Sequence, residues 1–158
     1  MTAPTLIDQT SLDELSAQAQ QLPRLRRNRN FHPTDEAPAH RLLNGVEPGS
    51  YIRPHRHLDP AKDETLVVLR GRFGLVLFDE GGQVLDRVVL AAGGPVLGMD
   101  IPHGSFHAIL SLAPGSVFFE AKAGPFLPLT EAEKAPWAPP EGAPEAAAYL
   151  ASLEALFA

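Results

Sequence analysis

The strongest constraint on the fold is the pattern of the central segment, residues 41–122. Short runs rich in Val, Leu, Ile and Phe alternate there with turns that contain glycine or proline, such as Glu47-Pro48-Gly49. About eight strands are expected, and because no helical crossover interrupts them, the sheets must be antiparallel. Such a unit without free edges is most simply a jelly roll or a related closed barrel, so the predicted fold class is all-β. The expected strands are 41–46, 50–57, 65–70, 73–79, 84–90, 95–98, 106–112 and 116–122.

Short helices are predicted on both sides of this segment. Ser11 and Glu14 have capping-box spacing, which predicts a helix over 11–21. Recurrent prolines after residue 124 indicate an extended strap, and an apolar stripe predicts a last helix over 144–157. We therefore expect one domain in three parts: an N-terminal helix and connection (1–40), a barrel (41–123), and a proline-rich strap with a C-terminal helix (124–158). The strap and the apolar stripe could cover a second copy, which favours a homodimer.

Composition limits the partners and the chemistry of any site. The chain has no cysteine, which excludes disulfides and thiolate ligands. A net charge of -6 argues against general nucleic-acid binding, which needs a basic face. Neither a signal peptide nor an apolar run of about 20 residues is recognisable, so we expect no membrane association and a cytoplasmic location.

Histidines and one glutamate indicate a metal site. His55 and His57 alternate along an expected strand, so both imidazoles share one face. Glu64 follows across a turn, and His107 begins a later strand. Three imidazoles and a carboxylate suit one divalent ion, Fe(II), Mn(II), Ni(II) or Zn(II), and leave open positions for a small-molecule substrate. Histidines lining a metal-free pocket are the alternative.

These residues resemble the two motifs of the cupin superfamily. The first motif is matched by Gly49, His55, His57, Glu64 and Gly71, and the second by Pro102, Gly104 and His107. The interval between His57 and Glu64 is longer than usual, and Ser111 stands where many cupins carry asparagine. The resemblance implies a double-stranded β-helix, the jelly-roll cupin barrel, with short N- and C-terminal helices around it.

A wider resemblance runs from about residue 24 to residue 137. The stretches RLRRNRNFH, LLNGVEPGSYIRPHRH and GMDIPHGSFHAILSLAPGSVFFEAKAGPF are similar to the WbuC family of cupin metalloproteins, which is associated with bacterial surface-polysaccharide biosynthesis. This resemblance implies a metal-dependent enzyme that acts on a small polar or carbohydrate-type substrate. Isomerisation, epimerisation and dioxygenation all stay open, and a non-catalytic module that binds a small ligand or a metal is the alternative.

Two further side chains are candidates for acid–base chemistry. Glu120 shares a strand face with Phe118 and Lys122, so it is either an acid or base near the metal or a rim charge paired with Lys122, and the rim is favoured. Tyr51 shares the face of His55, as a pocket hydroxyl or as a residue packed at the rim.

Three residues are candidates for substrate binding. On a regular strand Arg53 would share the face of His55 and His57 and could therefore face an anionic substrate. Pro54 could disturb this alternation. Arg27 belongs to an arginine cluster that is either an anion-binding fork or a solvated flank. His32 either lines the barrel mouth or makes a local loop hydrogen bond.

Overall fold

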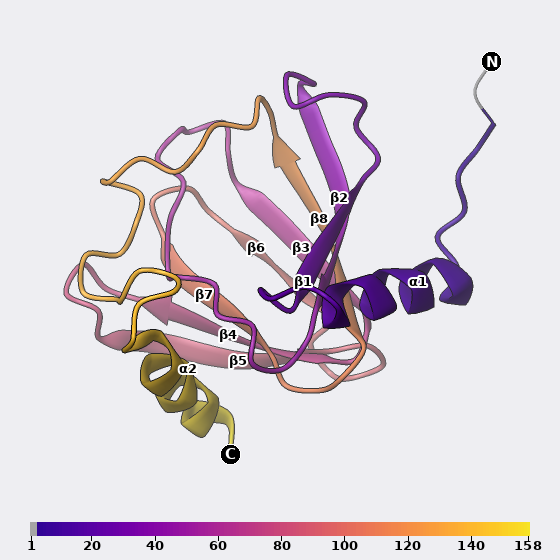
Figure 1. Cartoon of the computed structure of the whole chain (residues 1–158). Helices are drawn as coiled ribbons and strands as arrows, with labels where there is room; N and C mark the ends of the chain where they lie inside the picture. The colour runs from indigo at the N-terminus through magenta and orange to yellow at the C-terminus, as the bar shows by residue number, and fades with distance from the viewer. Residues whose placement is uncertain (1–2) are drawn as a thin grey trace.

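The predicted all-β architecture is confirmed by a computed structural model, which describes residues 3–158. Two antiparallel sheets face each other, one with the strand order β1-β2-β8-β3-β6 and one with the order β5-β4-β7 (Figure 1). This arrangement is a jelly-roll barrel with a short helix near each end of the chain. The strands are β1 Arg26–Asn30, β2 Ala39–Val46, β3 Glu64–Arg70, β4 Arg72–Phe78, β5 Val84–Ala91, β6 Gly98–Ile101, β7 Phe106–Ser111 and β8 Ser116–Ala123.

The apolar core fills the space between the two sheets. Alternating residues of β3, β4 and β8 point inward, and Phe73 meets Phe118 edge to face with ring centroids 5.1 Å apart. Both rings are almost completely buried, and burial of an aromatic side chain contributes on the order of 2–3 kcal/mol. Toward one end of the barrel this core gives way to polar side chains, and the candidate site lies there.

The first helix, α1 (Gln9–Gln20), packs on the outer face of the larger sheet. Leu12 and Leu15 bury their side chains against Leu43 and Val117. The capping prediction was displaced by one turn: Asp8 is the N-cap and Ser11 completes the capping box, because Asp8 accepts the backbone N–H of Ser11 at 2.9 Å.

The second helix, α2 (Ala146–Glu154), continues into a short 3-10 turn, η1 (Ala155–Phe157), and covers the outer face of the smaller sheet. Leu150 and Leu153 belong to the same buried cluster as Val76 and Leu110. The apolar stripe is therefore buried within the chain itself. Figure 1 shows α2 below β4 and β5. No helix in the described range has the length and apolarity needed to cross a bilayer.

Three local predictions differ from the structure. The expected strand 50–57 is an extended segment with isolated bridges at His55 and no regular ladder, because Pro54 has no backbone N–H to donate to one. The expected strand 95–98 is displaced to Gly98–Ile101 behind a turn. The arginine-rich segment, expected to be a flank, forms β1 and pairs with β2 over five residues on each side.

Candidate metal centre

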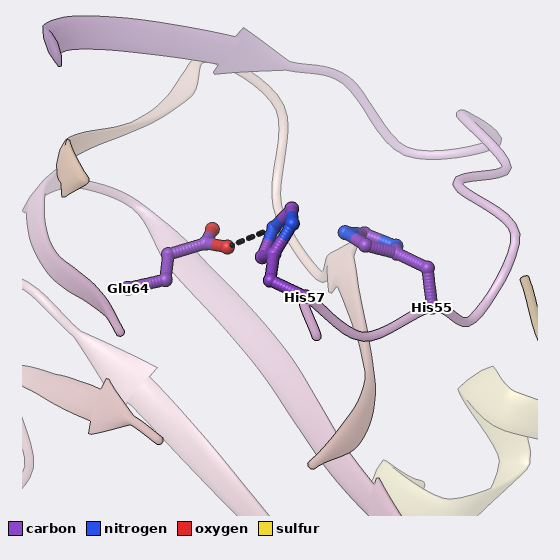
Figure 2. Close-up of side chains that lie close together, drawn as sticks. All are labelled: His55, His57 and Glu64. Atoms are coloured by element: carbon purple, nitrogen blue, oxygen red, sulfur yellow. Dashed lines mark hydrogen bonds and ion pairs between the residues drawn. The ribbon is translucent and has the colours of Figure 1, made fainter. Parts of the chain in front are cut away.

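Three side chains converge at the open end of the barrel. His55, His57 and Glu64 each present one ligand atom, and these atoms lie within 4.8 Å of one another (Figure 2). Glu64 is the first residue of β3, whereas both histidines come from the extended segment that enters the barrel before it. The long interval between His57 and Glu64 forms a turn and brings the carboxylate back to the imidazole, with His57 Nε2 3.0 Å from Glu64 Oε2.

His107 joins this group from β7. The backbone N–H groups of His55 and His107 each donate to the carbonyl of the other residue, at 3.1 and 2.9 Å. Their ring centroids are consequently 4.7 Å apart, and His107 Nε2 lies 3.8 Å from Glu64 Oε2. The structure thus brings together all four side chains predicted as ligands.

The backbone fixes the orientation of two imidazoles. His55 Nδ1 is 3.0 Å from the carbonyl oxygen of Arg53, and His107 Nδ1 is 3.0 Å from that of Ser105. A carbonyl accepts only, so each Nδ1 must carry the proton and donate it. Each Nε2 then keeps a free lone pair. Such bonds to the outer ring nitrogen are typical of histidines that bind metals.

Burial and charge set the protonation states of the cluster. Burial lowers the pKa of His55 to about 3 and also lowers that of His107, with mutual repulsion adding to the shift at His55. Burial alone would raise the pKa of Glu64, but the hydrogen bond from His57 and the charge of Lys122 outweigh it, and the pKa is well below the usual value. Neutral imidazoles beside a charged carboxylate are the forms that bind a divalent cation.

The donor set fits a divalent metal ion. Three imidazole nitrogens and one carboxylate oxygen suit a borderline cation, and no thiolate competes because the chain has no cysteine. Four protein ligands leave one or two positions open on a metal ion whose coordination number is five or six. The geometry therefore supports a site for a divalent metal ion.

The four side chains stand in the wall of a cavity of about 520 Å³. Its inner end is apolar and includes Ile52, Ile109 and Phe118, and polar residues of β1 and β2 form another wall. A cavity of this volume is within the range of about 300–1,000 Å³ that is typical of small-molecule sites. The other polar lining residues are Arg26, Asn28, Asn30, His32, Asp35, His40, Asn44, Lys62, Glu120 and Lys122.

Glu120 lies inside this cavity and is also an ion-pair partner. The predicted alternation along β8 holds, since Phe118, Glu120 and Lys122 all line the cavity. Lys122 Nζ lies 2.9 Å from Glu120 Oε1 and 3.7 Å from Glu64 Oε2, and Asn44 donates to Glu120 at 3.0 Å. Rim pairing was favoured from the sequence, but Glu120 is buried, and its pKa is raised by burial and by the charge of Glu64.

Tyr51 and Arg53 do not reach the cavity. The Tyr51 hydroxyl donates to the carbonyl of Pro139 at 2.8 Å, and the ring packs in the cluster beneath α2. Arg53 donates twice to the carbonyl of Ala135 and so holds the strap. A pocket position was one alternative for both residues, because side chains on a regular strand alternate between two faces. This segment forms no regular strand around Pro54, so that alternation does not hold.

The two N-terminal candidates for substrate binding, Arg27 and His32, differ in their position relative to the cavity. Arg27 is exposed on the face opposite the cavity, which agrees with the solvated flank and not with an anion-binding fork in the cavity. Its neighbour Arg26 lines the cavity instead, with its guanidinium bonded to Glu141 at 2.8 Å. His32 meets both alternatives: it lines the cavity, and its Nδ1 accepts the backbone N–H of Arg41 at 3.2 Å. Its ring stacks on His40 with centroids 3.9 Å apart.

Sequence reasoning missed several polar lining residues, including Lys62 and Asn44. Asn44 had a detectable signal, because Leu42, Asn44 and Val46 alternate with residues of the opposite face along β2. Lys62 had none, because it lies in a turn.

The lowered histidine pKa values predict that the metal-free protein loses stability on acidification. An unfolded histidine binds a proton near pH 6.5, whereas folded His55 does so only near pH 3. Between these values the unfolded state binds more protons, so the free energy of unfolding falls as the pH falls. Glu120, with its raised pKa, opposes this trend. We expect a net loss of about 2 kcal/mol between pH 7 and pH 5.

Urea unfolding of chelator-treated protein at both pH values measures this loss. The variant His55→Gln should show a clearly smaller loss than the wild-type protein. Equal or greater stability of the wild-type protein at pH 5 would contradict the expected sign.

Comparison with known proteins gives a family and a fold. A family model described as "Domain of unknown function (DUF6016)" matches residues 7–90, just over half of the chain, which include His55, His57 and Glu64 but not His107. No curated protein matches the chain. Two solved structures are similar in fold: KdgF from Halomonas sp. and the conserved protein SPY1581 of unknown function from Streptococcus pyogenes.

Both similarities concern the fold alone. KdgF is 18% identical, with a TM-score of 0.51 over 65% of this chain and 82% of its own. SPY1581 is 11% identical, with a TM-score of 0.53 over 80% of this chain and 93% of its own. At these identities the reaction has to be argued from the site.

Proposed function

Since the chain belongs to the DUF6016 family, whose description assigns no function, and has the cupin fold, we propose from its site that it is a metal-dependent enzyme acting on a small polar substrate. His55, His57, Glu64 and His107 hold one divalent ion. The observation that carries the proposal is the convergence of three imidazoles and one buried carboxylate in the wall of a cavity.

The residues beside the cluster support catalysis. Glu120 is a buried carboxyl group whose pKa lies above its ordinary value, and it lines the same cavity as the ligands. It can take a proton from a substrate or return one, while Lys122 and Asn44 hold its two oxygens. A divalent ion at the cluster would supply a Lewis acid that stabilises negative charge on a substrate oxygen. Proton transfer by Glu120 fits an isomerase or epimerase.

The substrate class and the pathway rest on the resemblance to the WbuC family. We propose a carbohydrate-type substrate in surface-polysaccharide metabolism. The carboxamides of Asn28 and Asn30 line the cavity, and amides both donate and accept hydrogen bonds, as binding of sugar hydroxyls requires. A dioxygenase that uses Fe(II) is compatible with the same ligands.

A non-catalytic binding module is the second candidate. Lys122 favours it, because the ammonium group lies 3.3 Å from His57 Nε2 and 3.7 Å from Glu64 Oε2 and already neutralises the carboxylate. In that case the cluster would bind a ligand by polar contacts without a metal, or would store a metal without turnover.

Metal analysis of the purified protein tests the proposal. After growth with Fe, Mn, Ni and Zn, we expect about one ion per chain, since all four ligands come from one chain. Loss of metal from His55→Ala is expected in the same measurement. Less than about 0.2 ion per wild-type chain after reloading would contradict a resident metal.

A homodimer remains a proposal of its own. The reason for which the sequence favoured a dimer is weakened, because the apolar stripe of α2 is buried within the chain. Phe126 and Leu127 are exposed apolar side chains of the strap that could cover a second copy.

A further inference from the structure

The cavity contains a lysine without a counter-ion. Lys62 is only 8% exposed and lines the cavity, and its Nζ donates to the carbonyl of Pro125 at 2.6 Å. Among residues 3–158, no carboxylate forms an ion pair with it. A buried charge without a partner of opposite sign is costly, so such a group indicates a missing anion.

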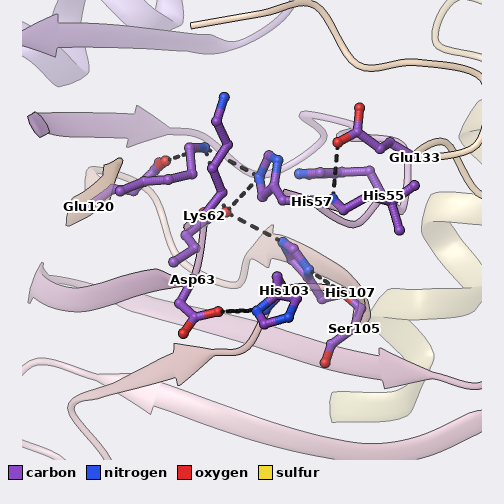
Figure 3. Close-up of polar contacts among 12 residues, drawn as sticks. His55, His57, Lys62, Asp63, His103, Ser105, His107, Glu120 and Glu133 are labelled. Atoms are coloured by element: carbon purple, nitrogen blue, oxygen red, sulfur yellow. Dashed lines mark hydrogen bonds and ion pairs between the residues drawn. The ribbon is translucent and has the colours of Figure 1, made fainter. Parts of the chain in front are cut away.

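The second lysine of the cavity shows the contrast. Lys122 pairs with two carboxylates, those of Glu120 and Glu64, and its charge is thereby neutralised. Figure 3 shows the side chain of Lys62 extended, with its ammonium end pointing away from His55, His57 and His107, whereas Lys122 Nζ lies 2.9 Å from Glu120 Oε1. The cavity therefore has one paired ammonium group and one unpaired ammonium group.

We propose that Lys62 binds a carboxylate of the substrate, and that the carbohydrate-type substrate proposed above is therefore a small organic acid. This inference rests on the proposed function, because the acid would occupy the cavity that the metal ligands line. An ammonium group has three N–H donors, and the carbonyl of Pro125 takes one. The two that remain match the two oxygens of a carboxylate.

The other charges of the cavity favour a carboxylate over a phosphate. Arg26 is not free for an anion, because its guanidinium bonds Glu141, Ser50 and the carbonyl of Tyr51. A phosphate dianion is usually held by several donors or by an arginine fork, and one lysine provides neither. The buried carboxylates of Glu64 and Glu120 also disfavour a second negative charge nearby.

The apolar end of the cavity has room for the carbon skeleton of the acid. Ile52, Ile109 and Phe118 are among the apolar residues that line the cavity, together with the polar residues of β1 and β2. A structural role alone does not account for Lys62, because a neutral donor would bond the carbonyl of Pro125 without burying a charge. A ligand with one carboxylate and a partly apolar body accounts for both features.

Matched small molecules test this inference by binding. The probes are hydroxy acids of about three to six carbons, their primary amides and the corresponding phosphate monoesters, titrated into manganese-loaded protein by calorimetry. We expect the tightest acids to bind about tenfold more tightly than their amides and more tightly than the phosphates, as for a charge-assisted hydrogen bond. Lys62→Gln should remove this preference, and Lys62→Arg should retain it. Lys134→Gln, which removes an exposed lysine of the surface pair with Glu131, is the matched control and should change nothing.

Several outcomes would overturn the inference. These are equal binding of acids and amides, tighter binding of phosphates, or no acid with a Kd below about 10 mM. The comparison in the wild-type protein needs no variant, so it stands even if Lys62→Gln fails to fold. Metal content is measured in the same samples. A protein without metal contradicts the proposed function, whereas a metal-loaded protein without a preference for acids contradicts only the role of Lys62.

Discussion

Replacement of His107 by alanine should lower the affinity for Zn(II) or Mn(II) by about a hundredfold or more. Binding free energies of about 10 kcal/mol or more are typical of sites with four protein ligands, so each ligand contributes on the order of 2–3 kcal/mol. His107 is 2% exposed, and its Nε2 lies 3.8 Å from Glu64 Oε2. Loss of this imidazole leaves His55, His57 and Glu64, which are too few to hold the ion as tightly.

His103 provides a matched control within the same motif. Its side chain is 42% exposed, and its Nδ1 is bonded to Asp63 at 2.7 Å, away from the lining of the cavity. His103→Ala should keep the wild-type affinity within about threefold, since an exposed ion pair contributes little. Competition against a chromophoric chelator measures all variants, and His107→Gln repeats the test with a side chain that fills the space. Equal affinities for His103→Ala and His107→Ala would contradict the assigned ligand.

The sequence predicted the barrel because its turns are chemically distinct from its strands. Strands β2, β4, β5, β7 and β8 begin and end within two residues of the expected positions. Alternation along β8 also placed Glu120 and Lys122 on one face, and both line the cavity in the structure, although the rim had been favoured for Glu120. These features depend on local chemistry, namely glycine and proline at turns and a period of two along strands.

The cluster was predictable for another reason. Its four residues stand at intervals that resemble the cupin motifs, but the strand alternation assumed for His55 and His57 is not what brings them together. Pro54 interrupts the ladder, and the mutual backbone bonds of His55 and His107 hold the segment in place. The correct convergence of the side chains thus came from the spacing of the motif more than from the expected strand.

Other features could not be predicted because they depend on contacts between segments that are distant in the sequence. The segment RRNRN has no apolar alternation, yet it forms β1, because its inner face borders a polar cavity and Arg29 on its outer face approaches Glu14 of α1. Lys62 lies in a turn, where lysine is usually exposed. Its burial depends on the strap that begins at Pro125, more than sixty residues later in the chain.

Gly71→Ala should destabilise the fold by about 3 kcal/mol, a combination of backbone strain and crowding. Gly71 follows β3 with φ +79°, where a side chain is strained, and a Cβ would lie 2.8 Å from the Cα of Ser116. The Ser116 hydroxyl also bonds the backbone of Arg72 and the carbonyl of Ala113, so Ser116 cannot yield without loss of these bonds. The glycine that ends the first motif is thus required for the close approach of two turns and takes no part in binding.

Gly93 separates the two contributions to this loss. It has nearly the same backbone conformation, φ +74°, but no atom lies within 4 Å of the position of a Cβ. Gly93→Ala should therefore cost only about 1–2 kcal/mol, since only the conformational strain remains. Urea unfolding of both variants measures the difference. If the two substitutions cost the same, the contact with Ser116 does not constrain Gly71, and the positive φ alone explains the need for glycine there.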